Sequence, residues 1–289
     1  MDIPKIGTVP NLPAKDYHAH PATGSSTLKN YLKFPTAAHA RDAIENPKEA
    51  GDAALRGTVT HTLLLEPHRL DLDYVIEREK LHDKTRLIKN GGSKEDWDAM
   101  KKRADELLLP IVDHKTWREA NGMADSVKAH KQWKKLGKGA EFELSVFGQI
   151  NGHPVKARYD AVKNGVILDV KTCRFPLTDA KIMQVIASEK YHLSAAMYLE
   201  VGKSIGLDVD TFNWVFVESF RPYLCRFFEA KPKMLEVGLE EFYYALEKHG
   251  QCKKDKKWPG YTEEITEIDL PDWYESREAW MYEETEGTI

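Results

Sequence analysis

The stretch ARYDAVKNGVILDVKTC, residues 157–173, has an acid on each side of an Asn-Gly pair and a lysine shortly after the second acid. Asn-Gly between two runs of β-forming residues is typical of a two-residue hairpin turn. Such a turn pairs Lys163 with Val166 and, further along the strands, Asp160 with Asp169. Lys171 lies two residues beyond Asp169 and therefore on the same strand face.

A second Asn-Gly pair, at residues 151–152, predicts a preceding hairpin in which Glu143 faces Asp160. Three carboxylates would then be neighbours on one sheet face, with opposite Cβ atoms about 4.5–5.5 Å apart. A solvated polar face would instead place lysines opposite the acids, whereas this register places acids opposite acids. The pattern favours a divalent cation, Mg²⁺ with Mn²⁺ as a substitute, held by carboxylate oxygens. Lys171 could then reach a substrate phosphate or an attacking water.

Hydrophobic periodicity predicts an α+β protein without internal repeats. The chain should contain a central mixed sheet with an antiparallel meander, flanked by helices and preceded by a helical N-terminal part. Helices are expected at residues 25–34, 53–67, 93–108, 117–136, 176–206 and 233–250. Strands are expected at residues 141–150, 153–162, 165–173, 211–219 and 223–230.

Charge is unevenly distributed along the 289 residues. Residues 261–289 hold ten acids and one base, a net charge of −9, so the other 260 residues carry +5 within the total of −4. Residues 126–140 contain five lysines and no acid, and residues 248–258 contain five more lysines. These clusters are either solvated helix faces or phosphate contacts. The candidate DNA-binding lysines are Lys128, Lys131, Lys134 and Lys135.

Two further features limit the class of protein. The three cysteines have no C-x-x-C spacing, which excludes a cysteine-ligated zinc site and a four-cysteine iron-sulfur cluster. No apolar leader or membrane-spanning run is present, so we expect a cytoplasmic protein with no membrane partner.

Several motifs together resemble a known family. RGTVTHTLLLEP, residues 56–67, is similar to the G-x-x-x-H motif of RecB-like nucleases, with Gly57 and His61 on one helix face. It is preceded by YHAHPATGSSTLKNYLKFPTAAHA and followed by AEFELS, KARYD, ILDVKT and YHLSAAMY, in the order seen in the RecE, or exonuclease VIII, nuclease domain. The resemblance places the chain in the PD-(D/E)XK superfamily, with an α/β/α restriction-endonuclease-like core. It implies an exonuclease domain over residues 1–260, mostly helical in 1–140 with the sheet core in 141–260, followed by an acidic, aromatic-containing segment at 261–289.

The resemblance also implies an activity: metal-dependent hydrolysis of one strand of linear double-stranded DNA from its 5′ end, in phage or prophage recombination within a bacterial host cell. It implies a single-strand-annealing protein partner and a homo-oligomeric ring, with a tetramer favoured. By this resemblance His61, Asp160, Asp169 and the carbonyl of Val170 are metal ligands, and Lys171 is the catalytic lysine. Glu143 is a further catalytic acid that binds a second metal or a water, and Tyr198 is a DNA contact.

One position departs from the family pattern. The family has a glutamine shortly before the helix tyrosine, whereas here Ser194 precedes Tyr198, and Gln184 is the candidate substitute. Two alternatives remain open: a RecB-like or Cas4-like nuclease acting on single strands or flaps, and a DNA-binding relative without catalysis. The acidic segment could bind the basic body, contact a partner protein, or pack on the domain.

Overall fold

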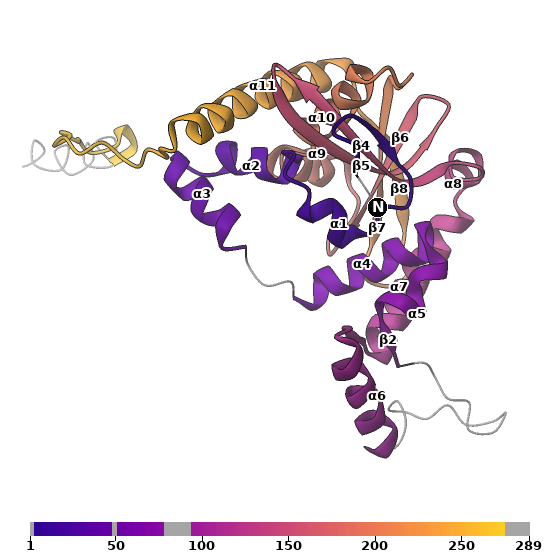
Figure 1. Ribbon diagram of the computed structural model, residues 1–289. Coiled ribbons are helices and arrows are strands. Elements are labelled where there is room, and N and C mark those ends of the chain that lie inside the picture. The colour runs from indigo at the N-terminus through magenta and orange to yellow at the C-terminus, as the bar shows by residue number, and fades with distance from the viewer. Residues whose placement is uncertain (1–2, 48–50, 78–93, 275–289) are drawn as a thin grey trace, which may run out of the picture.

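The computed structural model describes residues 3–47, 51–77 and 94–274, and its centre is a six-stranded mixed sheet (Figure 1). The strand order is β1-β4-β5-β6-β7-β8, in which only β6 and β7 run parallel. The strands are β1 (Gly7–Val9), β4 (Glu141–Ile150), β5 (His153–Lys163), β6 (Val166–Cys173), β7 (Thr211–Glu218) and β8 (Cys225–Glu229). The predicted fold class is confirmed.

Both predicted hairpins have the expected register. Ile150 pairs with His153 across one turn, and Lys163 pairs with Val166 across the other. The asparagine and the glycine of each turn have positive φ, as a type I′ turn requires. Because β6 and β7 are parallel, the chain between them must cross over the sheet, and the helix pair α9 (Asp179–Ser188) and α10 (Tyr191–Ser204) makes this crossover.

Helices cover both faces of the sheet. On one face, α10 packs on β4, β5 and β7 beneath α2 (Ser25–Lys33) and α11 (Pro232–Asp255), around a cluster that includes Trp214 and Phe216. On the other face, α4 (Asp52–Leu65) and α7 (His114–Ala129) enclose Val170, Val215 and their neighbours. The short α8 (Lys131–Leu136) follows α7.

Smaller elements complete the N-terminal part. They are α1 (Ala14–Ala19), α3 (Ala37–Glu45), the 3₁₀ turn η1 (Pro67–Arg69), α5 (Leu70–Asp73), α6 (Lys94–Leu107) and the parallel pair β2 (Val75–Ile76) and β3 (Ile111–Val112). No helix within the described ranges is long and apolar enough to cross a membrane.

The structure corrects two sequence predictions. The helix expected over residues 117–136 is broken at His130, whose extended backbone ends α7 and whose side chain caps α8 through the amide of Gln132. The edge strand β1 was not predicted, because its three residues carry too little periodic signal.

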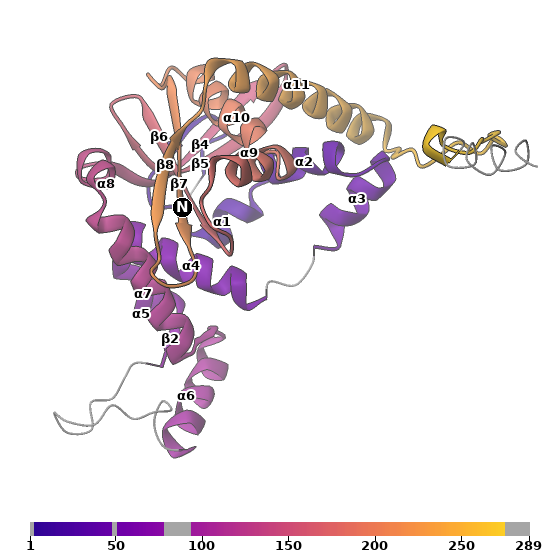
Figure 2. The same ribbon diagram turned by 180° about the vertical axis from the view of Figure 1, so that it is seen from behind.

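The C-terminal arm, residues 261–274, leaves the body beyond α11 (Figures 1 and 2). Its base contacts the body, since the Tyr261 and His39 rings lie 5.5 Å apart. Further along, Ile265 is 99% exposed and Ile268 is 91% exposed. This part of the acidic segment therefore does not pack on its own domain, and Trp280 and Tyr282 lie outside the described residues.

Candidate active site

The site forms where β5 and β6 separate. Their ladder ends at Ala161 and Leu168, one step before the expected pair of Asp160 and Asp169. There the Val170 amide donates to Asp160 Oδ2 at 2.6 Å, so a carboxylate replaces the backbone acceptor of the ladder. Asp160 is held between the two strands as a result.

On β4, Glu143 interrupts the strand geometry at the same level. Its φ is +50°, a left-handed conformation that is uncommon outside glycine, and the pairing with β5 skips this residue. On one side of the interruption, Leu144 and Tyr159 belong to the cluster beneath α10. On the other side, Phe142 and Ala161 belong to the cluster beneath α7. At Glu143 and Asp160 the hairpin therefore changes from packing on one core cluster to packing on the other. A strict alternation of inward and outward side chains along the strands does not hold at the site.

Asp169 and Lys171 form a close ion pair on β6. Lys171 Nζ lies 2.7 Å from Asp169 Oδ1 and 2.6 Å from Oδ2. Burial lowers the pKa of Lys171, but the charges of Asp169 and Asp160 outweigh it and raise that pKa above its usual range. Lys171 is therefore a fixed cation at the centre of the site.

His61 comes from α4 and completes the group. Its Nε2 donates to the Val170 carbonyl at 2.9 Å, and its Nδ1 lies 3.6 Å from Asp160 Oδ2. A Cβ at Gly57 would lie 3.1 Å from Thr172 Oγ1, so the glycine permits α4 to approach β6 closely. The Val170 carbonyl predicted as a metal ligand has His61 as its hydrogen-bond donor.

Three side chains can share a cation. One ligand atom each from His61, Glu143 and Asp160 lies within 4.8 Å of the others. Two carboxylates and an imidazole suit a borderline or hard divalent metal, so the residues present fit the implied Mg²⁺ or Mn²⁺. Asp169 lies beside this group, and its carboxylate oxygens face the Lys171 ammonium. A cation that binds Asp169 must therefore share this carboxylate with Lys171.

Sequence reasoning missed the cation that partners Glu143. Arg158 Nε donates to Glu143, and Arg158 Nη2 lies 3.6 Å from Glu66 Oε2. Burial, and then the charge of Asp160, raise the pKa of Glu143 to about 7 although Arg158 opposes the shift. Arg158 is two residues before Asp160, a spacing that could have suggested it. Glu66 is the last residue but one of the quoted G-x-x-x-H stretch, residues 56–67.

Aromatic residues and a second lysine line the α10 side of the site. Lys29 Nζ lies 4.8 Å from the Tyr191 ring centre, and Lys171 Nζ lies 5.4 Å from it. Burial and the Lys171 charge lower the pKa of Lys29 to about 7. Tyr198, predicted as a DNA contact, bonds Ser25 on α2, and burial together with the Asp169 charge raises its pKa. Lys29 and Tyr191 were also missed, since neither lies in a motif with acids.

The structure does not bring the four predicted DNA-binding lysines to the carboxylates. They are exposed at the end of α7 and on α8 (Lys128, Lys131, Lys134 and Lys135). Lys135 lies near Val166, and Lys171 is five residues further along β6, about 16 Å away at 3.3 Å per residue. Ser194 is buried in α10, and Gln184 is exposed on α9, where it accepts from Lys181 at 2.9 Å.

A sheet that opens over an acid, a second acid and a lysine two residues later, with helices on both faces, defines a PD-(D/E)XK-like fold. Residues 24–271 match the family described as "PDDEXK-like domain of unknown function (DUF3799)", and the chain belongs to this family. A comparison with curated proteins finds no match.

Comparison with solved structures supports this fold through the first of two alignments. The crystal structure of a "Putative exonuclease" from Eubacterium rectale aligns with a TM-score of 0.60 and 13% identity, over 90% of this chain and 96% of that chain. A second solved structure, SSO0001, aligns over 77% of this chain and 84% of that chain with 15% identity. Its TM-score of 0.29 is too low to indicate a shared fold.

Proposed function

We propose that this protein is a metal-dependent nuclease that hydrolyses phosphodiester bonds of DNA. The observation that carries the proposal is the grouping of His61, Glu143 and Asp160 beside the Asp169–Lys171 pair. Phosphodiester hydrolysis needs a cation to stabilise phosphoryl charge and a site that positions water, and this donor set provides for both.

Each side chain has a definite task in this proposal. His61, Glu143 and Asp160 hold Mg²⁺ or Mn²⁺, with Asp169 and the Val170 carbonyl completing the set. When bound, the metal supplies Lewis-acid stabilisation of the phosphoryl oxygens. Lys171, kept charged by Asp169, orients the attacking water or stabilises the charge that develops on the phosphate.

A cavity beside the site supports a phosphate-bearing substrate. It has a volume of about 520 Å³ and extends from Tyr198 along the first turn of α2. Its basic residues are His18, His20, Lys156, His249 and Lys253, and of the described residues that line it none is acidic. Burial and the Lys156 charge lower the pKa of His18 and of His20, so these imidazoles are neutral hydrogen-bonding groups. The cations of the cavity are Lys253 and Lys156, and Lys156 Nζ also donates to the carbonyls of Tyr17, His18 and His20.

The finer assignment follows the resemblance to RecE-like enzymes, and the "Putative exonuclease" from Eubacterium rectale supports its exonuclease part alone. We propose degradation of linear duplex DNA from the 5′ end, within phage or prophage recombination. A homo-oligomeric ring and a single-strand-annealing partner belong to the same proposal. Base-specific contacts are not expected, because an exonuclease must accept every sequence.

The test is a time course on 5′- and 3′-labelled linear duplex, single-stranded DNA and closed circular DNA. With Mg²⁺ or Mn²⁺ we expect loss of linear duplex from the 5′ end, while Ca²⁺, which accepts the same oxygens with looser geometry, supports binding with little cleavage. Preferential cleavage of single strands or flaps would favour the RecB-like or Cas4-like alternative.

Asp105→Asn, an exposed acid on α6, serves as the matched control for Asp160→Asn. Only the Asp160 variant should lose cleavage. Duplex binding without cleavage under every metal condition would favour the non-catalytic alternative, and equal rates on circles and linear DNA would rule out an end-dependent enzyme.

A further inference from the structure

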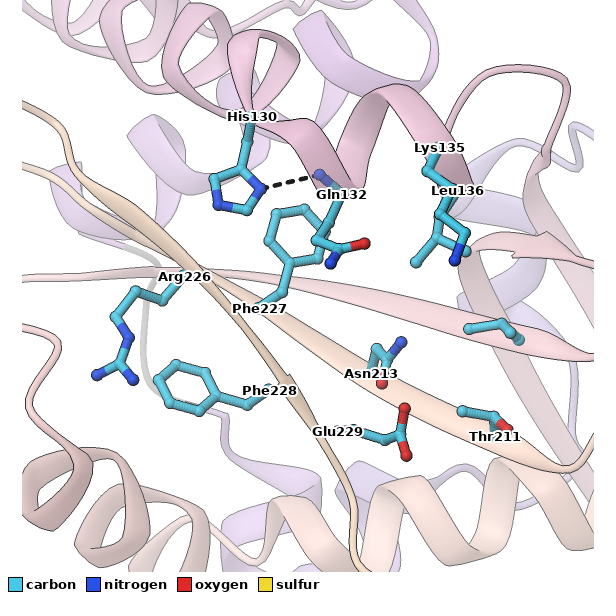
Figure 3. Close-up of a pocket in the computed structure, with 11 residues that line it drawn as sticks. His130, Gln132, Lys135, Leu136, Thr211, Asn213, Arg226, Phe227, Phe228 and Glu229 are labelled. Carbon is cyan, nitrogen blue, oxygen red and sulfur yellow. Dashed lines mark hydrogen bonds between the residues drawn. The ribbon is translucent and has the colours of Figure 1, made fainter.

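A groove lies on the sheet face that α7 and α8 cover (Figure 3). Its volume is about 590 Å³, and its floor is the β7–β8 pair, where Asn213 faces Glu229 and Val215 faces Phe227. The remaining lining residues that matter here come from α8 and β6, namely Lys135, Leu136 and Val166. The groove is open along β8, the last strand of the sheet.

One buried group in the groove lacks a partner. Asn213 is 9% exposed, and its Oδ1 has no hydrogen-bond donor within the described part of the chain. β8 is also the outer strand of the sheet among the described residues, so its outward backbone groups have no ladder partner there. A peptide that enters the groove can supply an N–H donor to Asn213 and pair with the edge of β8.

Positive charge gathers on α8, the helix from which Lys135 and Leu136 line the groove. Lys131, Lys134 and Lys135 are exposed on α8, and no ion pair engages them within the described ranges. Asn213 pairs in register with Leu168, whereas Asp169 and Lys171 project from the opposite side of β6. These lysines therefore lie away from the carboxylates.

The C-terminal arm has the complementary chemistry. Its 14 residues include five acids and no base: Glu263, Glu264, Glu267, Asp269 and Asp272. Ile265, Ile268 and Leu270 are 99%, 91% and 56% exposed, so the arm presents apolar side chains that its own body does not cover. Thr262, Ile265, Thr266 and Ile268 are β-branched residues that suit an added strand.

Figures 1 and 2 show that α8 and the arm are at opposite ends of the molecule. The described arm points away from the body, so its own groove is not the nearest acceptor. A groove on a second copy can receive the arm without any change in the body.

We propose that the C-terminal arm of one copy binds the α8 groove of a second copy. Ile268 and Leu270 pack on Phe227 and Leu136, and the arm acids face the α8 lysines. The arm and the groove are different surfaces, so the contact is heterologous, and repeating it gives a ring if the rotation closes. The proposed contact between copies does not depend on whether the protein is a nuclease.

The test measures mass in solution by light scattering, with the full chain at working concentrations. Wild type should have a multiple of the 33.1 kDa chain mass. Three variants should each fall to the single-chain mass: deletion of residues 262–289, Ile265→Ser with Ile268→Ser and Leu270→Ser, and Lys131→Glu with Lys134→Glu and Lys135→Glu. The deletion keeps Tyr261 and all the body contacts described above.

A charge exchange gives the sharpest result. Glu263→Lys with Glu264→Lys and Glu267→Lys should be monomeric alone, and so should the lysine-to-glutamate variant. Mixing the two should restore an assembly, because alternating copies match each reversed arm with a reversed groove and each unchanged arm with an unchanged groove. The mass should equal that of wild type if the wild-type assembly has an even number of copies, and in every case should exceed the single-chain mass. The matched control, Lys248→Glu with Lys254→Glu and Lys257→Glu, changes the same charge on and just beyond α11 and should assemble normally.

Other outcomes overturn the proposal. A wild-type protein with single-chain mass, or a mixture that stays monomeric, excludes the contact. If the arm variants dissociate while the α8 variant assembles, the arm binds elsewhere, for example at the apolar pocket between Pro35 and Tyr244. If the α8 variant assembles but loses duplex affinity, these lysines contact DNA instead.

Discussion

The carboxylate site and the α8 lysines use charge in opposite ways. At the site, Lys171 is paired with Asp169, and Arg158 is paired with Glu143, in a largely buried setting. On α8, Lys131 and Lys134 are exposed without an ion pair among the described residues. A buried charge depends on one partner, so the removal of either side chain leaves an uncompensated charge and should have a large effect. Exposed charges contribute through their combined electrostatic field, so the removal of a single exposed lysine should change activity or stability little.

The largest difference should appear in activity. Lys171→Met removes the cation that acts on the developing phosphate charge, so we expect the rate of duplex cleavage to fall by about 10²–10⁴-fold. Lys134→Met, the same substitution on α8, should change that rate by less than about twofold. Initial rates on a short labelled duplex with saturating Mg²⁺ measure both. Similar losses in the two variants would remove the distinction between the regions.

A second prediction compares the stability of the Asp160→Asn and Asp169→Asn variants in EDTA, without metal, by their melting temperatures. Asp169→Asn leaves the Lys171 ammonium without its anion and should lower the free energy of unfolding by roughly 2–4 kcal/mol. Asp160→Asn should leave it unchanged or slightly higher. Burial raises the pKa of Asp160, and the amide oxygen still accepts from Val170.

Repeating the melts with Ca²⁺ sharpens this contrast, because an ion bound to the folded state raises its stability. Wild type should gain and Asp160→Asn should gain less. If both asparagine variants melt well below wild type in EDTA, Asp160 is held by structural partners, and the metal assignment fails.

The smallest effect is a pH dependence of stability without metal. The pKa of Glu143 is raised to about 7 from an ordinary 4.5, so the folded state keeps a proton that the unfolded state loses first. The free energy of unfolding should therefore fall as pH rises from about 4.5 to 7, by at most about 3 kcal/mol. Glu143→Gln should flatten this decline, and urea titrations across that range measure it. An equal slope in both proteins would assign it to other groups.

The hairpin core of the site could be predicted from the sequence. Asn-Gly turns determine register over several residues, so the pairs that flank the site, Phe142 with Ala161 and Ala161 with Leu168, followed from the residue numbers. The expected pairs of Asp160 with Asp169 and of Glu143 with Asp160 are not ladder pairs. What could not be predicted is how the ladder ends there. The left-handed backbone at Glu143 and the bond from Val170 to Asp160 depend on surrounding packing rather than on local propensity.

Long-range partners were harder to predict. Arg158, Lys29 and Tyr191 enter the site from a strand and two helices, and no local pattern reports which distant side chains converge. The lysine cluster shows the same difficulty. Its composition predicts phosphate contacts, which stay a prediction, but composition does not show that the break at His130 places these lysines on α8, away from the carboxylates.

The hydrogen bond from His61 to Val170 spans 109 residues of sequence. During synthesis at about 5–20 residues per second, α4 leaves the ribosome roughly 5–20 s before β6 does. For most of that interval the helices of the N-terminal part exist without the carboxylates of β5 and β6. A ribosome-bound chain truncated before β6 lacks Asp169, Lys171 and the Val170 carbonyl, so it carries no complete site.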